Sequence, residues 1–176
     1  MNFLIYGATG YTGKLITQRA KKLNLNPILS GRNLEKLKKV AEPLGFEYET
    51  VELTNETKLL KLLEKVDLVL HCAGPFSATA KPMVDACLKT KTHYLDITGE
   101  ISVFERNKSL DNSAKESNIL IMSGVGFDVV PTDCLSAYMK KRMPDAKYLN
   151  ISIGGLSQIS SGTAKTAIEN ISKSFS

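Results

Sequence analysis

The chain has 176 residues, a composition ordinary for a globular protein and a formal net charge of +5 at pH 7. Its apolar runs stay well short of the ~20 residues that a membrane-spanning helix needs, and its lysines fall on predicted helix faces rather than in the dense basic stripe of a nucleic-acid-binding protein. The three cysteines, Cys72, Cys87 and Cys134, are too few and too widely spaced for a disulfide framework or a zinc site.

Short apolar runs alternate with segments of helical periodicity through most of the chain. Strands are predicted at 3–6, 27–30, 46–51, 67–72, 93–97 and 118–122. Helices are predicted at 14–23, 34–44 and 55–64, from Lys81-Pro82 onward, and after Ser102. This order predicts an α/β fold in which helices cover both faces of a doubly wound parallel Rossmann sheet. The polar strand 46–51 suits an edge of that sheet, and the apolar strand 67–72 suits its centre.

Individual residues mark where several of these helices are expected to begin. Asn33 can cap the helix over 34–44. Pro82 fits the first turn of the helix that follows the fourth strand. Ser102 and Glu105 form a capping-box signature ahead of the next helix.

The alternation changes after Asp128. Pro131 is expected to open a helix that ends before Pro144, followed by a strand at 148–153 and an amphipathic segment at 161–175. We therefore expect two domains: a Rossmann domain over 1–128 and, over 129–176, the beginning of a truncated, small α+β second domain.

The residues after the first predicted strand form a glycine turn, Gly7-Ala8-Thr9-Gly10-Tyr11-Thr12-Gly13. A dinucleotide pyrophosphate needs backbone amides directed at it with no side chain in the way, and the following helix adds the partial positive charge of its N-terminus. Here Gly7 allows a tight turn, Gly10 a close phosphate approach, and Gly13 close packing of the helix against the strand. We expect all seven residues to bind a dinucleotide cofactor, although a lone glycine pattern can also be an ordinary strand-to-helix turn.

The end of the second predicted strand selects between the two nicotinamide dinucleotides. An acidic residue there would accept hydrogen bonds from the ribose 2′-hydroxyl of NAD, but this sequence has Ser30-Gly31-Arg32-Asn33. The Arg32 guanidinium can pair with a 2′-phosphate through two hydrogen bonds, and Ser30 and Asn33 can donate further. The sequence therefore predicts NADP(H) in preference to NAD(H). The plainer alternatives are that Arg32 is a solvated loop residue and Asn33 only a helix cap.

Ligands of an open parallel sheet bind at the carboxyl ends of its strands. Leu53 and Thr54 are expected to flank the adenine. The residues expected to run past the ribose of the cofactor are Cys72, Ala73, Gly74, Pro75 and Phe76. Segments 96–100 and 124–128 are expected to approach the nicotinamide.

Catalytic residues cannot be assigned from the sequence. No tyrosine has a lysine four residues later, so the proton-transfer pair of short-chain dehydrogenases is absent. His71 and His93 fall within or next to strands and are expected to be structural. Asp96 and Asp128 are at strand ends and are expected to hold loops rather than to transfer protons.

Several segments, in this order and spacing, resemble the saccharopine dehydrogenase-like oxidoreductases, and look most like the branch that contains mycobacterial trans-acting enoyl reductases. They are the glycine turn, Ser30-Gly31-Arg32, Ala73-Gly74-Pro75-Phe76, 94–100, 126–133 and Ser161-Gly162-Thr163. The resemblance implies an NAD(P)-dependent oxidoreductase in which a Rossmann domain passes, at Phe127-Asp128, into an α+β substrate domain. Members commonly dimerise through that second domain, so the resemblance is also compatible with a homodimer.

Two functions follow as alternatives. The first is an oxidoreductase that passes hydride between NADP(H) and a small or lipid-like carbonyl, imine or enoyl substrate. The second is a non-catalytic NADP-binding module, either a redox sensor or a truncated fragment, because members of the family are usually much longer. The expected partner is a small-molecule substrate, with neither nucleic acid nor a membrane span. Because the N-terminus lacks the features of a secretory signal, a cytoplasmic location is expected.

Overall fold

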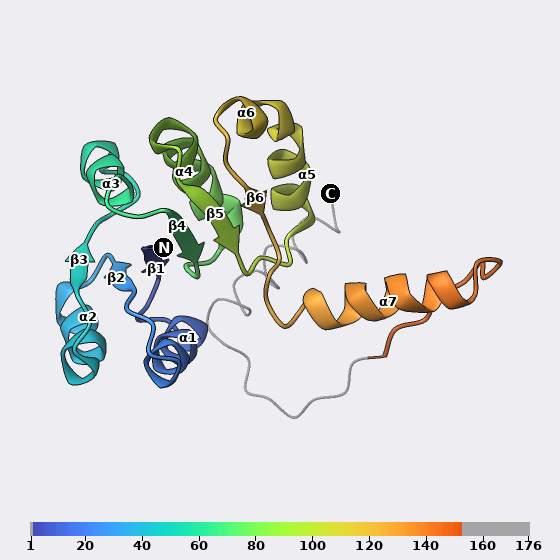
Figure 1. Ribbon diagram of the computed structural model, residues 1–176, viewed down its shortest axis with the longest axis horizontal. Helices are drawn as coiled ribbons and strands as arrows, with labels where there is room; N and C mark the ends of the chain where they lie inside the picture. The colour runs from blue at the N-terminus through green and yellow to red at the C-terminus, as the bar shows by residue number, and fades with distance from the viewer. Residues whose placement is uncertain (1, 153–176) are drawn as a thin grey trace, which may run out of the picture.

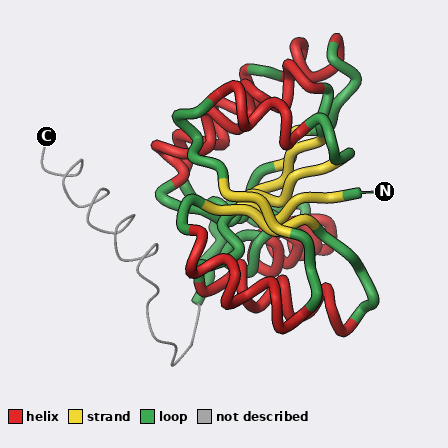
Figure 2. The backbone as a smooth tube through the Cα atoms, turned by 90° about the vertical axis from the view of Figure 1, so that its left-hand side faces the viewer, coloured by secondary structure: helices red, strands yellow, loops and turns green. Residues whose placement is uncertain are grey.

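The computed structural model describes residues 2–152, and these form a parallel sheet covered by helices on both faces (Figure 1, Figure 2). The strands are β1 (Phe3–Tyr6), β2 (Ile28–Gly31), β3 (Tyr48–Thr50), β4 (Leu68–His71), β5 (His93–Asp96) and β6 (Ile121–Met122). The helices are α1 (Tyr11–Lys22), α2 (Leu34–Ala41), the 3-10 turn η1 (Glu42–Leu44), α3 (Glu56–Leu63), α4 (Phe76–Thr90), α5 (Ile101–Ser109), α6 (Asp111–Glu116) and α7 (Val130–Arg142).

The strand order of the six-stranded sheet is β3-β2-β1-β4-β5-β6, and every neighbouring pair is parallel. The order reverses between β1 and β4, where Ile5 lies opposite Leu29 on one side and Leu70 on the other. In a sheet of this kind the crevice at the carboxyl ends of the two central strands is where ligands bind. The predicted fold class is therefore confirmed, with β3 at an edge and β4 at the centre.

The two faces of the sheet bury separate hydrophobic clusters because successive side chains of a strand point to opposite faces. Ile5 packs with the core under α1 and α2, whereas its neighbour Leu4 packs with the core under α3 and α4. Both residues are fully buried. Burying a side chain of this size stabilises the fold by about 1.5–3 kcal/mol, so the short strand β1 is anchored from both sides just before the glycine turn.

Three helices begin elsewhere than the sequence predicts. Helix α1 starts at Tyr11 rather than at 14, because Gly10 already occupies the N-cap position. Helix α4 starts at Phe76 rather than near Lys81-Pro82, which leaves Pro82 inside the helix. Helix α5 starts at Ile101, with Glu100 in the extended N-cap conformation, so the predicted capping box at Ser102 is wrong. For α2 the prediction is confirmed, since the Asn33 side chain accepts a hydrogen bond from the Lys36 amide at 2.9 Å.

The early start of α4 has a cause outside its own segment. The Phe76 and Ser77 amides donate to the carboxylate of Glu100, at 2.9 and 2.6 Å. The Phe76 ring is also buried, in a small cluster with Ala80 and Val103. These contacts stabilise a helical turn ahead of the one in which Pro82 was expected.

The predicted strands at 118–122 and 148–153 differ most from the structure. Strand β6 begins at Ile121 and not at Asn118, because Asn118 has a φ of +55°, in the left-handed region, and cannot be part of a strand. Residues 148–152 form no strand, and Tyr148 is 91% exposed. A strand needs a neighbour that accepts its backbone hydrogen bonds, and none of the described residues pairs with this segment.

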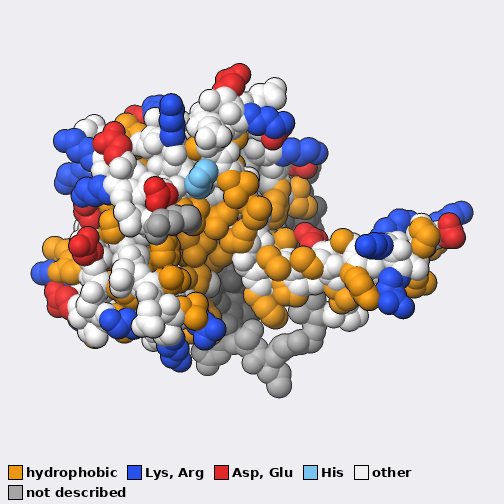
Figure 3. Space-filling model, in the orientation of Figure 1, with side chains coloured by type: hydrophobic (Ala, Val, Ile, Leu, Met, Phe, Trp, Pro, Cys, Tyr) orange, Lys and Arg blue, Asp and Glu red, His pale blue; other side chains and the backbone are white. Residues whose placement is uncertain are grey.

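Helix α7 extends away from the sheet (Figure 1). It begins with Pro131 in its first turn and ends at Arg142, before Pro144, as predicted. Exposed apolar side chains lie along it, among them Leu135 and Tyr138, and Figure 3 shows such side chains gathered along this helix and near its base. None of the helices between residues 2 and 152 has the length and apolarity that crossing a membrane requires. The predicted segment at 161–175, with Ser161-Gly162-Thr163, lies outside the described residues.

Candidate functional site

The glycine turn connects β1 to α1 and is hydrogen-bonded to the carboxyl end of β2. Gly7 has a φ of +87°, a conformation that favours glycine. The Gly7 and Ala8 amides both donate to the carbonyl oxygen of Ser30, at 2.8 and 3.2 Å, and the Gly10 amide donates to the Gly7 carbonyl at 3.0 Å. The turn is therefore held to the end of the neighbouring strand by backbone hydrogen bonds.

Two glycines of the turn lie where no larger residue fits. A Cβ atom on Gly7 would lie 2.8 Å from the Ala73 amide nitrogen, at the end of β4. A Cβ atom on Gly13 would lie 2.2 Å from the Gly7 carbonyl oxygen and 2.9 Å from the Ala8 Cα. Both distances are shorter than van der Waals contacts allow. The turn thus lies against the residues that follow β4, and Gly13 brings α1 close to the end of β1, as expected.

The N-terminus of α1 is open to an anion. Gly10 is its N-cap, and among the described residues no side chain caps the first turn, which also holds no acidic residue. Among residues 2–152, a Cβ atom on Gly10 would come within 4 Å of the Gly7 carbonyl oxygen alone. In contrast, α2 and α3 are capped by the side chains of Asn33 and Asn55. Exposed helix-end amides without a side chain in front of them fit a diphosphate.

Arg32 follows β2 directly and is exposed. It forms no ion pair with any residue in the described part of the chain. Its charge also reaches Tyr6 at the end of β1. Burial raises the pKa of Tyr6 to about 12, and the positive charge of the Arg32 guanidinium opposes that rise. An uncommitted guanidinium therefore stands beside the glycine turn.

Ser30 lies behind this surface. Its side chain is fully buried, and its hydroxyl donates to the Glu49 carbonyl oxygen on β3 at 2.7 Å. The sequence suggested that the Ser30 hydroxyl donates to a phosphate of the cofactor. In the structure that hydroxyl donates within the sheet instead, because side chains alternate along β2 and Ser30 points into the protein. Asn33 caps α2, as stated above, which leaves its amide nitrogen for other contacts.

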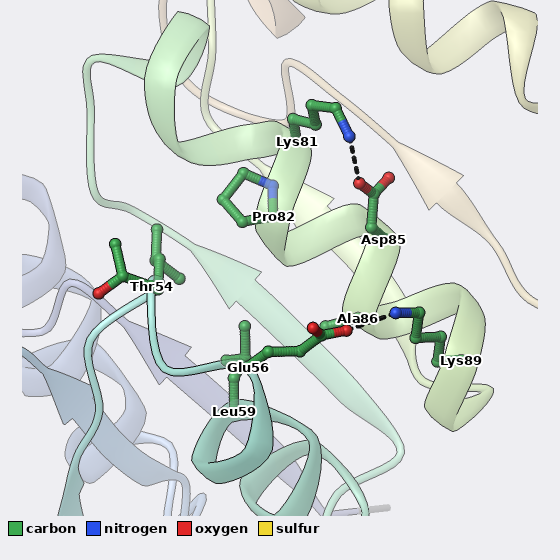
Figure 4. Close-up of a pocket in the computed structure, with 9 residues that line it drawn as sticks. Thr54, Glu56, Leu59, Lys81, Pro82, Asp85, Ala86 and Lys89 are labelled. Carbon is green, nitrogen blue, oxygen red and sulfur yellow. Dashed lines mark hydrogen bonds and ion pairs between the residues drawn. The ribbon is translucent and has the colours of Figure 1, made fainter.

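Leu53 and Thr54, in the loop between β3 and α3, line one side of a cleft of about 360 Å³ (Figure 4). The remaining lining residues come from the start of α3 and from α4: Glu56, Leu59, Lys81, Pro82, Asp85, Ala86 and Lys89. Two ion pairs join residues that line this cleft, Lys81 with Asp85 and Lys89 with Glu56. That the first two residues flank an adenine stays a prediction.

The segment Cys72–Phe76 is held from three directions. The Cys72 amide donates to the Tyr6 carbonyl oxygen at 2.8 Å, which continues the pairing of β4 with β1. The Thr79 hydroxyl lies 2.6 Å from the Ala73 carbonyl oxygen. Glu100 binds the Phe76 amide, as described for α4. Neither Thr79 nor Glu100 is adjacent in sequence to the segment that it holds, so these supporting contacts carry no local sequence signal.

Asp96 is a structural residue, as expected. Its side chain is fully buried at the end of β5 and accepts four hydrogen bonds of 2.8–3.0 Å. The donors are the Thr98 amide, the Gly124 amide, the Tyr94 hydroxyl and the Ser123 hydroxyl. Its carboxylate therefore ties together the residues that follow β5 and β6.

The two histidines are also structural. His71 is fully buried, and burial lowers its pKa to about 3, so its ring is neutral at physiological pH. Its Nε2 lies 3.1 Å from the Thr79 hydroxyl, and the Phe76 ring meets it edge-on. His93 accepts a hydrogen bond from the Leu120 amide at its Nδ1. Asp128 is exposed in the turn before α7, and its role stays a prediction.

Comparison with protein families gives one match over most of the described sheet. Residues 3–122 match the saccharopine dehydrogenase NADP-binding domain. Among curated proteins, the probable mitochondrial saccharopine dehydrogenase-like oxidoreductase of Arabidopsis thaliana is 32% identical over 75% of this chain and 33% of its own length. The saccharopine dehydrogenase-like oxidoreductase of Bos taurus is 27% identical over 95% of this chain and 45% of its own length.

A trans-acting enoyl reductase of Mycobacterium ulcerans is 30% identical over 79% of this chain and 35% of its own length. The chain therefore spans less than half the length of each of these relatives. The resemblance predicted from the motifs is confirmed, and so, at the level of the family, is the prediction of NADP(H) as cofactor.

Solved structures support the fold. Apo saccharopine dehydrogenase (L-Glu forming) from Saccharomyces cerevisiae superimposes with a TM-score of 0.70 at 18% identity, over 80% of this chain and 31% of that protein. The triphenylmethane reductase of Citrobacter sp., complexed with NADP(H), gives a TM-score of 0.54 at 20% identity, over 69% of this chain and 48% of that one. At these identities the likeness shows the Rossmann-like fold.

Proposed function

This chain belongs to the family of saccharopine dehydrogenase NADP-binding domains, and from that premise we propose that it binds NADP(H) across the carboxyl ends of β1 and β4, as the cofactor-binding part of an oxidoreductase. The observation that carries the proposal is the uncapped N-terminus of α1 behind Gly10. It offers backbone amides and the positive end of a helix at the switch point of the sheet, where a pyrophosphate binds.

The proposed site runs from β2 to β4. The turn 7–13 holds the pyrophosphate, and Arg32 binds the 2′-phosphate with the help of Asn33. Leu53 and Thr54 flank the adenine, and the segment Cys72–Phe76 lies along the ribose. We further propose the division into a cofactor domain over 1–128 and the beginning of a substrate or dimerisation domain over 129–176.

We propose that the reaction is hydride transfer to or from a small or lipid-like carbonyl, imine or enoyl substrate. Bound NADP(H) supplies the hydride chemistry, and the protein supplies orientation and exclusion of water. The names of the relatives, which are oxidoreductases and enoyl reductases, support this reaction class.

A second candidate function is a non-catalytic NADP-binding module. Its support is the state of the titratable groups near the strand ends: Asp96 is saturated with hydrogen bonds, and His71 is buried and neutral. Both side chains are fully buried, so neither lies within hydrogen-bonding reach of a substrate at the surface. In this reading the described residues bind and orient the cofactor but do not transfer protons.

The Arg32→Ala variant tests the cofactor assignment. Hydrogen bonds to a charged group contribute about 1.5–3 kcal/mol, so we expect NADPH to bind about 10- to 150-fold more weakly by fluorescence titration. NADH lacks the 2′-phosphate and should bind with little change. Arg19→Ala, which removes another exposed arginine near the end of α1, is the matched control. Equal losses for NADPH and NADH would contradict the role of Arg32.

A turnover assay separates the two functions. The wild-type chain is incubated with NADPH and a panel of carbonyl and enoyl compounds, and NADPH oxidation is followed by absorbance. Consumption that depends on one acceptor supports the oxidoreductase. NADPH binding without turnover on any acceptor supports the non-catalytic module.

A further inference from the structure

A continuous set of hydrogen bonds links the carboxyl ends of β6, β5 and β4. Asp96, at the end of β5, accepts from the Gly124 amide beyond β6 at 2.9 Å and from the Thr98 amide at 3.0 Å. The Thr98 hydroxyl in turn accepts from the Glu100 amide at 3.0 Å. Thr98 is fully buried, so its hydrogen bonds are protected from water.

Glu100 extends these hydrogen bonds to the start of α4, which follows β4. One of its carboxylate oxygens accepts from the Phe76 amide and the other from the Ser77 amide. These are the first two amides of α4, whose N-cap residue, Pro75, has no side-chain acceptor of its own. Glu100 therefore acts as the cap of a helix from the preceding β–α unit. A carboxylate at a helix N-terminus is favoured both by charge-assisted hydrogen bonds and by the helix dipole.

We propose that Glu100 is a positioning residue for the cofactor: its carboxylate fixes the backbone of Ala73–Phe76. The proposed function places this segment along the ribose of the cofactor, and we assign it here to the ribose of the nicotinamide half. This inference rests on the proposed function. When the carboxylate is lost, the segment must be ordered at the moment of binding, and that ordering lowers affinity. Arg32 follows β2, on the other side of the switch point from this segment, so we expect the contacts of the adenosine 2′-phosphate to stay intact.

The test compares NADPH with adenosine 2′,5′-bisphosphate, which carries the 2′-phosphate but lacks the nicotinamide half. Glu100→Gln keeps the shape of the side chain but replaces one acceptor oxygen with an NH₂ group and removes the charge. We expect NADPH to bind roughly tenfold more weakly, which corresponds to about 1.4 kcal/mol. The bisphosphate should bind as it does to the wild type. Glu105→Gln, an exposed glutamate on the same helix α5, is the control for the loss of charge.

Hydrogen exchange in the absence of cofactor gives a second readout. In Glu100→Gln the Phe76 and Ser77 amides should exchange faster, while the Ile5 amide in the central strand should not change. Unchanged exchange at Phe76 and Ser77 would show that the carboxylate does not hold the segment. Faster exchange with unaltered NADPH affinity would overturn the positioning role, and equal weakening of both ligands would show a general structural loss instead.

The outcome also separates this inference from the proposal beneath it. A wild-type chain that binds neither NADPH nor the bisphosphate contradicts the proposed function, and the inference falls with it. A wild-type chain that binds both, with a Glu100→Gln variant that also binds both equally well, contradicts the inference alone.

Discussion

Substituting Gly13 with alanine tests the packing on which the candidate site depends. Gly13 is buried in the first turn of α1, and an added methyl group would lie 2.2 Å from the Gly7 carbonyl oxygen and 2.9 Å from the Ala8 Cα. All of the nearest atoms belong to the backbone of the glycine turn, so no side-chain rotation can relieve the contact. Because ordinary carbon contacts are about 3.5–4.0 Å, α1 must move away from β1.

Two opposing effects set the expected magnitude. Overpacking a well-packed site costs about 1–3 kcal/mol. Replacing a glycine in a helix by alanine gains about 0.5–1 kcal/mol of backbone entropy. The contact with fixed backbone places Gly13→Ala towards the upper end of the cost, so we expect a net loss of about 1–2 kcal/mol in the free energy of unfolding. NADPH binding should be lost as well, because the amides of the turn are displaced.

Urea unfolding and NADPH titration measure the two effects. Gly99→Ala is the matched control for stability, since an added Cβ there meets no atom of the described residues within 4 Å and its φ lies outside the left-handed region. We expect that variant to range from neutral to about 1 kcal/mol more stable. If Gly13→Ala and Gly99→Ala unfolded at the same urea concentration, α1 would not be packed against the turn as described, and our account of the glycine turn would be refuted.

Two further predictions address the phosphate cradle and the pH dependence of stability. Gly10→Ala places a methyl group at the N-cap of α1, 3.3 Å from the Gly7 carbonyl oxygen. It should change the free energy of unfolding by no more than about 1 kcal/mol and weaken NADPH binding at least tenfold, or about 1.4 kcal/mol. Unchanged NADPH binding would argue against phosphate contact at Gly10. His71 has its pKa lowered by burial to about 3, against about 6.5 in an unfolded chain, so below pH 6.5 the unfolded state takes up a proton that the folded state does not. The contribution of His71 to the free energy of unfolding is therefore intact above pH 6.5 and declines by roughly 1 kcal/mol for each pH unit between 6.5 and 3. Urea unfolding across this range should show that the stability of His71→Phe falls less steeply with decreasing pH than that of the wild type, and parallel profiles would contradict the assignment.

The layered fold could be read from the sequence because each of its signals is local. Apolar strands such as 3–6 and 67–72 stand out from the helical periodicity around them, and alternation by itself implies a parallel sheet. The glycine turn could be found for the same reason, since its three glycines fall within seven consecutive residues. Position within the sheet followed too, because the polarity of β3 matches an edge.

What the sequence could not show depends on contacts between distant segments. The cap of α4 comes from Glu100, 24 residues beyond Phe76, so a local reading placed the helix start at Pro82 instead. The burial of Ser30 follows from the neighbour that β2 finds in β3. At 148–152 an alternating pattern indicated a strand, but pattern alone supplies no partner.

Ser30 has a consequence for anyone who redesigns the cofactor preference of this domain. Its carbonyl oxygen accepts hydrogen bonds from the glycine turn, and its hydroxyl donates to the edge strand β3. One small residue therefore links the turn to the edge of the sheet. Arg32, two positions later, is exposed and forms no ion pair with the described residues. We therefore expect that substitution at Arg32 can change the selectivity between NADP(H) and NAD(H) while the hydrogen bonds of Ser30 stay in place.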